Sequence, residues 1–353
     1  MLDLTSILQA GVAARAWPCA AAAVVSPRQP SRIFLAGSHT YCGDKQLRES
    51  DWFDLASLSK VLVTTTLVAQ LCEQGTLSLN TTLAEIFPEF TLGLQAAWRQ
   101  EVTIRHLLAH CSGLPAGYPF HQLSPDRRQD FRQILLSLPL TAAPGQVECY
   151  SDLGMMILGE VVVTLLGQNL DSLARQQIFS PLGLHDGIGY CPALQQRSSC
   201  VPTELCADSG QPWQGMVHDE NARWLGGIAG HAGLFANITT LARLVQALFP
   251  SNSKLLPEDM LRLFTRPAGI IPASSRCLGW DSPSRNSSAG EHISPQGYGH
   301  TGFTGTCIWI DPEKELAVIL LSNAVHPCRE DKRHAYPEFL RQVCNAVFAG
   351  SDK

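Results

Sequence analysis

Strand-like segments lie at both ends of this 353-residue chain, and helical segments fill its middle. Apolar or alternating runs typical of strands occupy residues 20–25, 32–37, 305–310 and 316–321. A strand buries its apolar face only when it pairs with other strands, so both ends of the chain should meet in one sheet. The sequence therefore predicts an α+β fold (an α/β sandwich), in which an antiparallel sheet is flanked by terminal helices and an all-helical lobe is inserted.

Helical patterns cover residues 4–16, 57–75, 103–110, 128–137, 152–166, 239–249 and 336–348. From this order we expect two lobes. Residues 1–56 and 226–353 would form a sheet-containing α/β lobe, and residues 57–225 a mostly helical lobe, with the active site in the cleft between them. A hydrophobic content of 45% is sufficient for cores of this size.

Charge and composition exclude several classes of protein. The 26 Lys and Arg are scattered among 31 Asp and Glu, which argues against nucleic acid as a partner. No stretch approaches the roughly 18 to 20 apolar residues of a membrane span. The N-terminus carries an acid where a signal peptide is basic, and the twelve cysteines are spread out, so we expect a cytoplasmic protein. A periplasmic location would follow if a leader had been trimmed, and a Cys200–Cys206 disulfide stays open.

Ser57 and Lys60 are three residues apart at the start of a helical segment. This spacing places both side chains on one helical face. A serine hydroxyl needs a neighbouring base to become a nucleophile, and a lysine that loses its charge through burial can supply one. The pair therefore predicts a nucleophile, Ser57, and its base, Lys60.

Two further motifs add catalytic groups. The segment Tyr150-Ser151-Asp152 enters a helix from a loop, and a phenol close to cations can accept a serine proton and return it to a leaving group. The strand His300-Thr301-Gly302 is punctuated by glycines, which let backbone amides approach a ligand closely.

A metal site is not expected. His106 and His110 have the spacing of a zinc helix, but Leu107 stands where the glutamate is needed and no third ligand is evident. Cys149 has no partner that would activate it, and His231 between glycines is expected to contact backbone. The polar run 217–222 is interpreted as a solvated loop, and no cofactor is expected.

In their order and spacing, these motifs resemble the serine β-lactamase and penicillin-binding-protein superfamily. The resemblance is to the class C-like branch, with its family VIII esterases, DD-peptidases and D-aminopeptidases. It covers nearly the whole chain, since further family-like segments occupy residues 103–115, 181–184, 227–235, 278–281 and 321–323. It implies a β-lactamase/transpeptidase-like fold and a serine hydrolase without cofactor or metal.

The resemblance also implies roles for individual residues. Ser57 would attack a carbonyl, Lys60 and Tyr150 would share the proton, and the backbone amides of Ser57 and Phe303 would hold the oxyanion. His300 belongs to the catalytic set. Asp152, Thr301 and Gly302 would bind substrate.

Two departures from the family pattern bear on the substrate. His300 stands where β-lactamases usually carry lysine, and Asp152 where asparagine is frequent. Histidine titrates near pH 6.5, so we expect activity to change between pH 6 and 7 and β-lactam hydrolysis to be inefficient. Asp152 would repel a substrate carboxylate and attract an amine. The expected substrate is a small ester, an amide or a D-peptide.

Two other functions remain open: a DD-carboxypeptidase or β-lactamase, and a binding protein that keeps the fold without turnover. The presence of Ser57, Lys60 and Tyr150 together favours catalysis. The acyl group is not specified by these motifs, because loops such as 118–128 and 282–294 are expected to shape the pocket.

Overall fold

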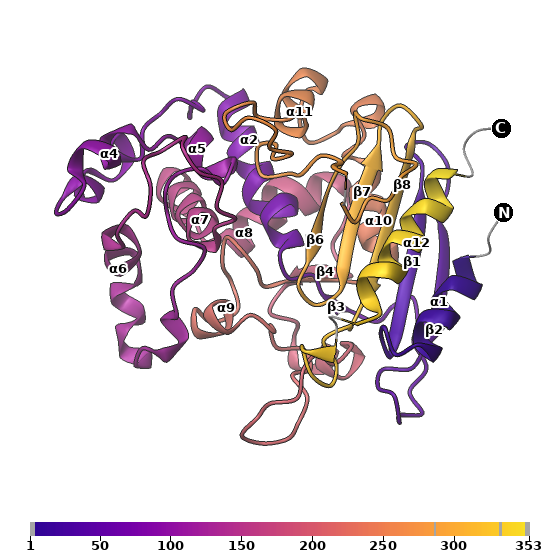
Figure 1. The fold of residues 1–353 in the computed structure, drawn as a ribbon. Helices are drawn as coiled ribbons and strands as arrows, with labels where there is room; N and C mark the ends of the chain where they lie inside the picture. Colours follow the sequence, from indigo (N-terminus) through magenta and orange to yellow (C-terminus); the bar gives the residue numbers. More distant parts are fainter. Residues whose placement is uncertain (1–3, 286, 332–333, 350–353) are drawn as a thin grey trace.

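Both ends of the chain contribute to one five-stranded antiparallel sheet in the computed structural model, which describes residues 4–285, 287–331 and 334–349. The strand order is β2-β1-β8-β7-β6. The strands are β1 (Cys19–Val25), β2 (Arg32–Gly37), β6 (Tyr298–Gly302), β7 (Thr306–Asp311) and β8 (Leu316–Ser322). The predicted α+β fold and the joining of the two ends in one sheet are confirmed (Figure 1).

Strand β1 lies between β2 and β8, and its small side chains are buried on both faces of the sheet. Ala21 is opposite Leu321 of β8, and all seven residues of the strand are buried. Successive side chains of a strand point to opposite faces, so Ala20 and Ala22 pack with the terminal helices while Ala21 and Ala23 join the main core.

Helices cover both faces of the sheet. The terminal helices α1 (Leu4–Ala13) and α12 (Tyr336–Phe348) lie on one face (Figure 1), and α10 (Ile238–Gln246) packs against β1 and β8 from the other. The remaining helices and helical turns are α2 (Thr66–Glu73), α3 (Leu83–Ile86), α4 (Ala96–Glu101), α5 (Ile104–Leu108), α6 (Phe131–Ser137), α7 (Asp152–Leu166), α8 (Leu170–Ala174), α9 (Glu220–Trp224), α11 (Glu258–Thr265), η1 (Lys60–Thr65), η2 (Pro88–Thr91), η3 (Phe120–Gln122), η4 (Pro125–Asp130), η5 (Arg175–Phe179), η6 (Ser180–Leu182), η7 (Leu194–Ser199) and η8 (Pro250–Asn252).

A second, three-stranded sheet was not predicted. Its order is β3 (Phe53–Asp54), β5 (Leu234–Ala236) and β4 (Ile188–Tyr190), all antiparallel. The inserted segment is therefore not all-helical, because β4 belongs to it. These strands are only two or three residues long, which is too short for a period of two to be visible in the sequence.

Arg99 of α4 connects η2 and α6 in the helical region through hydrogen bonds. Its side chain is 2% exposed, and its guanidinium donates to the backbone carbonyls of five residues at 2.6–3.2 Å. The acceptors are Leu94, Phe90, Leu136, Ser137 and Leu138. One cation thus satisfies the ends of η2 and α6, which would otherwise leave buried carbonyls without donors.

Replacing Arg99 with alanine is expected to lower the free energy of unfolding by at least about 3 kcal/mol, because buried carbonyls lose charged donors. Urea denaturation followed by circular dichroism measures this loss. The matched control is Arg127→Ala, whose ion pair with Asp130 lies on the surface and whose removal should change stability by about 0.5 kcal/mol or less. Equal effects of the two substitutions would contradict the assigned role of Arg99.

Two features relevant to the cellular setting follow from the described residues. Within residues 4–285, 287–331 and 334–349, no single helix is long and apolar enough to cross a membrane. Only the pair Asp152–Leu166 and Leu170–Leu182, bent by 77°, meets that length and composition together. All twelve cysteines are unpaired thiols, including Cys200 and Cys206.

Candidate active site

A strained turn presents Ser57 between β3 and the helical segment η1. Ala56 has a φ of +48°, a conformation uncommon for a residue with a side chain. The buried Asp54 carboxylate holds this turn, since it accepts from the backbone N–H of Ala56 at 2.9 Å and from that of His218 at 2.6 Å. Burial raises the pKa of Asp54, and these donors partly offset that effect.

Lys60 is fully buried one turn after Ser57, and three oxygens surround its ammonium. Its Nζ lies 2.7 Å from Ser57 Oγ, 2.9 Å from the carbonyl oxygen of His231 and 2.8 Å from Asp152 Oδ1. The Asp152 contact is close, but it is poorly aligned for a hydrogen bond. Lys60 also begins a π-helical turn, a distortion that is frequent at functional sites.

The charge of Lys60 differs from the expectation. Burial alone would lower the pKa of its ammonium, but Asp152 and Tyr150 outweigh burial, and the pKa is raised. The prediction that burial makes Lys60 a neutral base is therefore wrong. The ammonium donates to Ser57 Oγ at 2.7 Å.

Asp152 likewise has a different partner from the one expected. Lys60 lowers the pKa of this carboxyl against the opposing effect of burial, so Asp152 is ionised and paired. Its negative charge is paired with the ammonium of Lys60. The prediction that Asp152 presents a free negative charge to a substrate amine is corrected on this ground.

A contact between His231 and Asp219 supports the carbonyl that Lys60 contacts. The His231 ring is 1% exposed, and its Nε2 lies 2.9 Å from Asp219 Oδ1. Asp219 also caps α9 by accepting from the N–H of Ala222 at 2.7 Å, and the pair with His231 lowers the pKa of its carboxyl despite burial. The ring of His231 was expected to contact backbone, but it contacts the carboxylate of Asp219, and only the His231 carbonyl meets Lys60.

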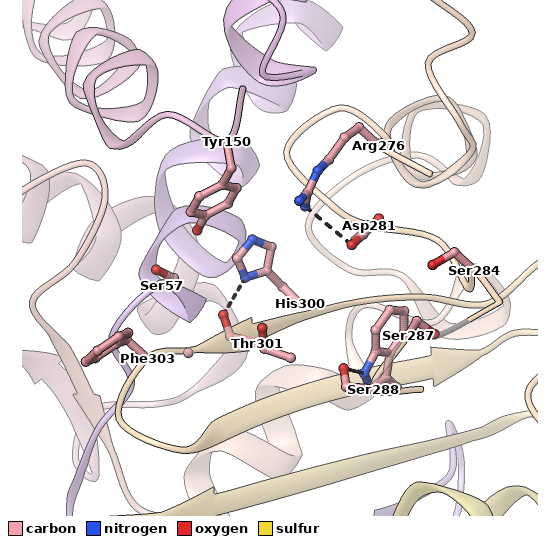
Figure 2. A pocket seen from close by; sticks show the side chains of 12 residues that line it. Ser57, Tyr150, Arg276, Asp281, Ser284, Ser287, Ser288, His300, Thr301 and Phe303 are labelled. Atoms are coloured by element: carbon pink, nitrogen blue, oxygen red, sulfur yellow. Dashed lines mark hydrogen bonds and ion pairs between the residues drawn. The ribbon is translucent and has the colours of Figure 1, made fainter. Parts of the chain in front are cut away.

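Tyr150 lies between two imidazoles and two cations. Its ring centroid is 4.6 Å from that of His110 and 5.9 Å from that of His300. Lys60 Nζ and the guanidinium carbon of Arg276 each lie 5.2 Å from the centroid. In Figure 2 the phenol oxygen points toward the space between Ser57 and His300, where it can exchange a proton with a bound substrate.

His110 positions the loop that carries Tyr150. Its Nδ1 accepts from the N–H of Ser151 at 3.1 Å, and its carbonyl accepts from the N–H of Cys149 at 2.8 Å. Burial lowers the pKa of this imidazole well below its usual value, so the ring is neutral. The other histidine of the zinc-like pair, His106, completes a helix cap with Thr103 instead.

The turn between β6 and β7 is hydrogen-bonded to the backbone just before Ser57. The hydroxyl of Thr304 donates to the carbonyl of Asp54 at 2.7 Å, and that of Thr306 to the carbonyl of Leu55 at 3.1 Å. A side chain at Gly302 would clash, because a Cβ there would lie 2.5 Å from the Leu55 oxygen. These contacts bring the backbone of Phe303 beside Ser57, whose own N–H has no acceptor within the described parts of the chain.

A cavity of about 370 Å³ opens beside these groups (Figure 2). Its lining residues are Ser57, Tyr150, Arg276, Asp281, Ser284, Ser287, Ser288, His300, Thr301, Gly302, Phe303 and Trp309. The loop 282–294 thus contributes to the pocket as expected. The loop 118–128 does not line it.

His300 is neutral at the cavity wall. Its Nδ1 donates to the carbonyl of Thr301 at 2.8 Å. Burial, assisted by the charges of Lys60 and Arg276, lowers the pKa of His300 to about 3. The prediction that this imidazole titrates between pH 6 and 7 is therefore wrong.

Arg276 is the principal group that the sequence did not indicate. Its guanidinium lies 3.1 Å from Glu148 and 3.3 Å from Asp281, and it reaches the cavity from a loop. No periodicity marks such a position, although it lies two residues before the family-like segment 278–281. Asp219 was likewise missed, because a polar run gives no sign that one of its members is paired inside the protein.

Residues 4–285, 287–331 and 334–349 contain no group of three or more His, Cys, Asp or Glu side chains arranged to hold a metal ion.

A serine, a lysine and a tyrosine gathered at a cavity in an α+β fold are typical of serine hydrolases. Comparison with known proteins identifies the family. The profile of the family described as Beta-lactamase matches residues 4–342, and the chain belongs to that family.

Curated relatives carry hydrolase names. The chain is 30% identical to the "N-acetylmuramyl-L-alanine amidase" of Bacillus subtilis (strain 168), over 82% of this chain and 72% of the relative. It is 31% identical to the "Putative D-alanyl-D-alanine carboxypeptidase" of Escherichia coli (strain K12), over 78% of this chain and 69% of the relative. The chain is a serine hydrolase.

Solved structures confirm the fold. "EstCE1, a hydrolase with promiscuous acyltransferase activity" superimposes with a TM-score of 0.78 at 20% identity, covering 97% of both chains. A class C beta lactamase superimposes with a TM-score of 0.74 at 17% identity, covering 97% of this chain and 96% of the other.

Replacing Asp152 with asparagine is expected to move the alkaline limb of the pH profile of kcat/KM to lower pH, because Lys60 loses the carboxylate that raises its pKa. At pH 7.5 we expect kcat/KM to fall by less than about 10²-fold, since no acid–base group is removed. The exposed pair Asp171 and Arg175 offers a matched control, Asp171→Asn, which should leave the profile unchanged. An unmoved alkaline limb in Asp152→Asn would count against the paired role of Asp152.

His300→Gln should not change the shape of the pH profile of kcat/KM between pH 5 and 8. The imidazole already has a pKa of about 3 in the folded protein, so it is neutral on both sides of this window. The amide of glutamine is neutral as well. An inflection near pH 6.5 in the wild type that disappears in His300→Gln would show that His300 titrates during turnover.

Proposed function

We propose that Ser57 is the nucleophile of an acyl-enzyme hydrolase that cleaves small amides, with ester cleavage as an easier reaction of the same site. The contact of 2.7 Å between Lys60 Nζ and Ser57 Oγ at the edge of the cavity carries this proposal. Within it, His300 belongs to the wall of the substrate cavity, and Thr301 and Gly302 line that cavity.

In the acylation step, Tyr150 enters as a phenolate, the Ser57 oxygen attacks the substrate carbonyl carbon, and the serine proton passes to the Tyr150 oxygen. The charge that develops on the carbonyl oxygen is stabilised by the backbone N–H groups of Ser57 and Phe303, each typically worth about 3 to 4 kcal/mol. Lys60 remains an ammonium throughout and stabilises the negative charge on the serine and tyrosine oxygens. Tyr150 then gives the proton to the leaving nitrogen or oxygen as the bond to carbon breaks.

Deacylation repeats these roles with water. A water molecule gives its proton to Tyr150 and attacks the ester carbonyl, and the bond to Ser57 Oγ breaks as the proton returns to that oxygen. The acyl group leaves as a carboxylic acid. No cofactor is required for either step.

The substrate class is inferred from the relatives. The names of both curated relatives specify an amide bond in which alanine takes part. We therefore propose a small alanine-containing peptide or amide as the natural substrate.

The proposal also keeps the two lobes, with boundaries at residues 56–57 and 225–226. The unpaired thiols support a reducing compartment such as the cytoplasm.

Turnover of p-nitrophenyl butyrate at pH 7.5, followed by rapid mixing, tests the proposed nucleophile. We expect a burst of p-nitrophenol in the wild type and no burst in Ser57→Ala, because the alanine cannot form the acyl ester. The steady-state rate of the variant should fall by at least about 10³-fold.

Ser59→Ala provides the matched control, because Ser59 is a neighbouring buried serine that donates to the carbonyl of Ala56 and lies outside the cavity. It should retain the burst. Full activity of Ser57→Ala would overturn the assignment of the nucleophile. A wild type that binds the ester without Ser57-dependent release would favour a binding protein.

A further inference from the structure

His218 is a buried polar residue that lies outside the cavity and that the mechanism described above does not use. It is 3% exposed and belongs to the polar run 217–222, whose members are all buried or partly buried. The interpretation of this run as a solvated loop is therefore wrong. Burying a polar ring is costly unless its contacts compensate, so the contacts of His218 indicate what the residue does.

The backbone of His218 is attached to the turn that presents Ser57. Its N–H donates to Asp54 Oδ2 at 2.6 Å, while Asp54 Oδ1 accepts from the N–H of Ala56 at 2.9 Å. Asp54 thus links His218 to the residue before the nucleophile. This turn places the N–H of Ser57, which is the first of the two proposed oxyanion donors.

The ring of His218 lies against the residue that carries the second proposed donor. The ring centroids of His218 and Phe303 are 5.6 Å apart and the planes are inclined by 22°, which is a stacked arrangement. His218 Nε2 lies 3.1 Å from Glu204 Oε2. The same carboxylate oxygen accepts from Nε of Arg329 at 2.7 Å, and the guanidinium carbon of Arg329 lies 5.8 Å from the Phe303 centroid. Phe303 therefore contacts two side chains that Glu204 holds in place.

The segment around Phe303 needs such a restraint. Gly302 precedes Phe303, and Gly305, with a φ of +107°, follows two residues later, so the backbone here is permissive. The Phe303 side chain is 49% exposed, and burial alone does not fix its position. The stack with His218 is thus a contact that limits rotation of the Phe303 amide.

We propose that His218 is a positioning residue of the oxyanion site, which keeps the amides of Ser57 and Phe303 aligned with each other. It acts on Ser57 through Asp54 and on Phe303 through the stacked ring, and it touches neither the substrate nor the reacting atoms. The inference rests on the proposed acyl-enzyme function, because the two donors matter only when charge develops on a carbonyl oxygen.

Rapid mixing with p-nitrophenyl butyrate tests this role through His218→Ala, which removes the ring and keeps the backbone N–H that Asp54 accepts. We expect the rate constant of acylation to fall by at least about tenfold, because a misaligned donor stabilises the transition state less well. The dissociation constant of the ester, obtained from the same data, should change by less than about twofold, since the lost interaction belongs to the transition state.

Two further variants separate positioning from general stability. His218→Phe keeps an aromatic ring against Phe303 and should acylate within about threefold of the wild-type rate, while Glu204 retains Arg329. The matched control is His39→Ala, because His39 is also buried against a carboxylate, Asp51 at 2.9 Å, and lies outside the cavity. It should leave the acylation rate of the folded protein unchanged, whatever its effect on stability.

A double-mutant cycle identifies the residue through which His218 acts. Phe303→Ala removes the stacked ring and keeps the backbone N–H, so it should itself slow acylation by at least about tenfold. In that background His218→Ala should cost less than about threefold more, because the contact it would break is already absent. An undiminished loss in the Phe303→Ala background would overturn the proposal.

Wild-type acylation by His218→Ala would overturn it as well. If His218→Ala does not fold, Phe303→Ala decides, because its side chain is half exposed: a tenfold loss supports the restraint and a wild-type rate contradicts it. Absence of a Ser57-dependent burst in the wild type would instead overturn the proposed function.

Discussion

The buried ammonium of Lys60 is the constraint on which the arrangement of the site depends. A charge with 0% exposure is stable only when it is paired and hydrogen-bonded, because desolvation is costly. Its partners come from three separate segments: the serine turn, the start of α7 that carries Asp152, and the glycine-rich loop that carries His231. The need to satisfy one cation thus brings distant parts of the chain together at the nucleophile.

The sheet is attached to this centre by a second set of contacts. Thr304 and Thr306 donate to backbone carbonyls just before the strained Ala56 turn, and Asp54 holds that turn from within. The positive φ of Ala56 is a conformation that persists only where the surroundings fix it. A rigid serine turn next to a rigid strand end is what a preorganised oxyanion site requires, because its donors must be in place before charge develops.

Features of the fold could be predicted from the sequence where apolar periodicity or the spacing of a motif indicates them. The long helix of residues 152–166, the terminal helix of residues 336–348 and the pairing of both chain ends follow from apolar patterning, and the structure has them. The short strands β3, β4 and β5 were not predictable, because two or three residues carry no usable period. The grouping of Ser57, Lys60 and Tyr150 could be predicted because each belongs to a motif with a fixed spacing.

Charge states were beyond sequence reasoning, since they depend on which groups meet in three dimensions. The type of residue at position 60 suggests a base that burial could neutralise, but the carboxylate of Asp152 reverses that result. The residue at position 300 suggests a titrating histidine, but burial near two cations keeps it neutral. The loop position of Arg276 and the pairing of Asp219 with His231 have no periodic signal at all.

A covalent acyl-Ser57 intermediate can be detected by mass spectrometry of protein quenched with acid during turnover of a butyryl ester. We expect one butyryl group per chain, located by peptide mapping on the peptide that contains Ser57. A butyryl group on another residue, such as Cys149 or Lys60, would contradict this expectation. So would rapid turnover with no covalent adduct at any quench time.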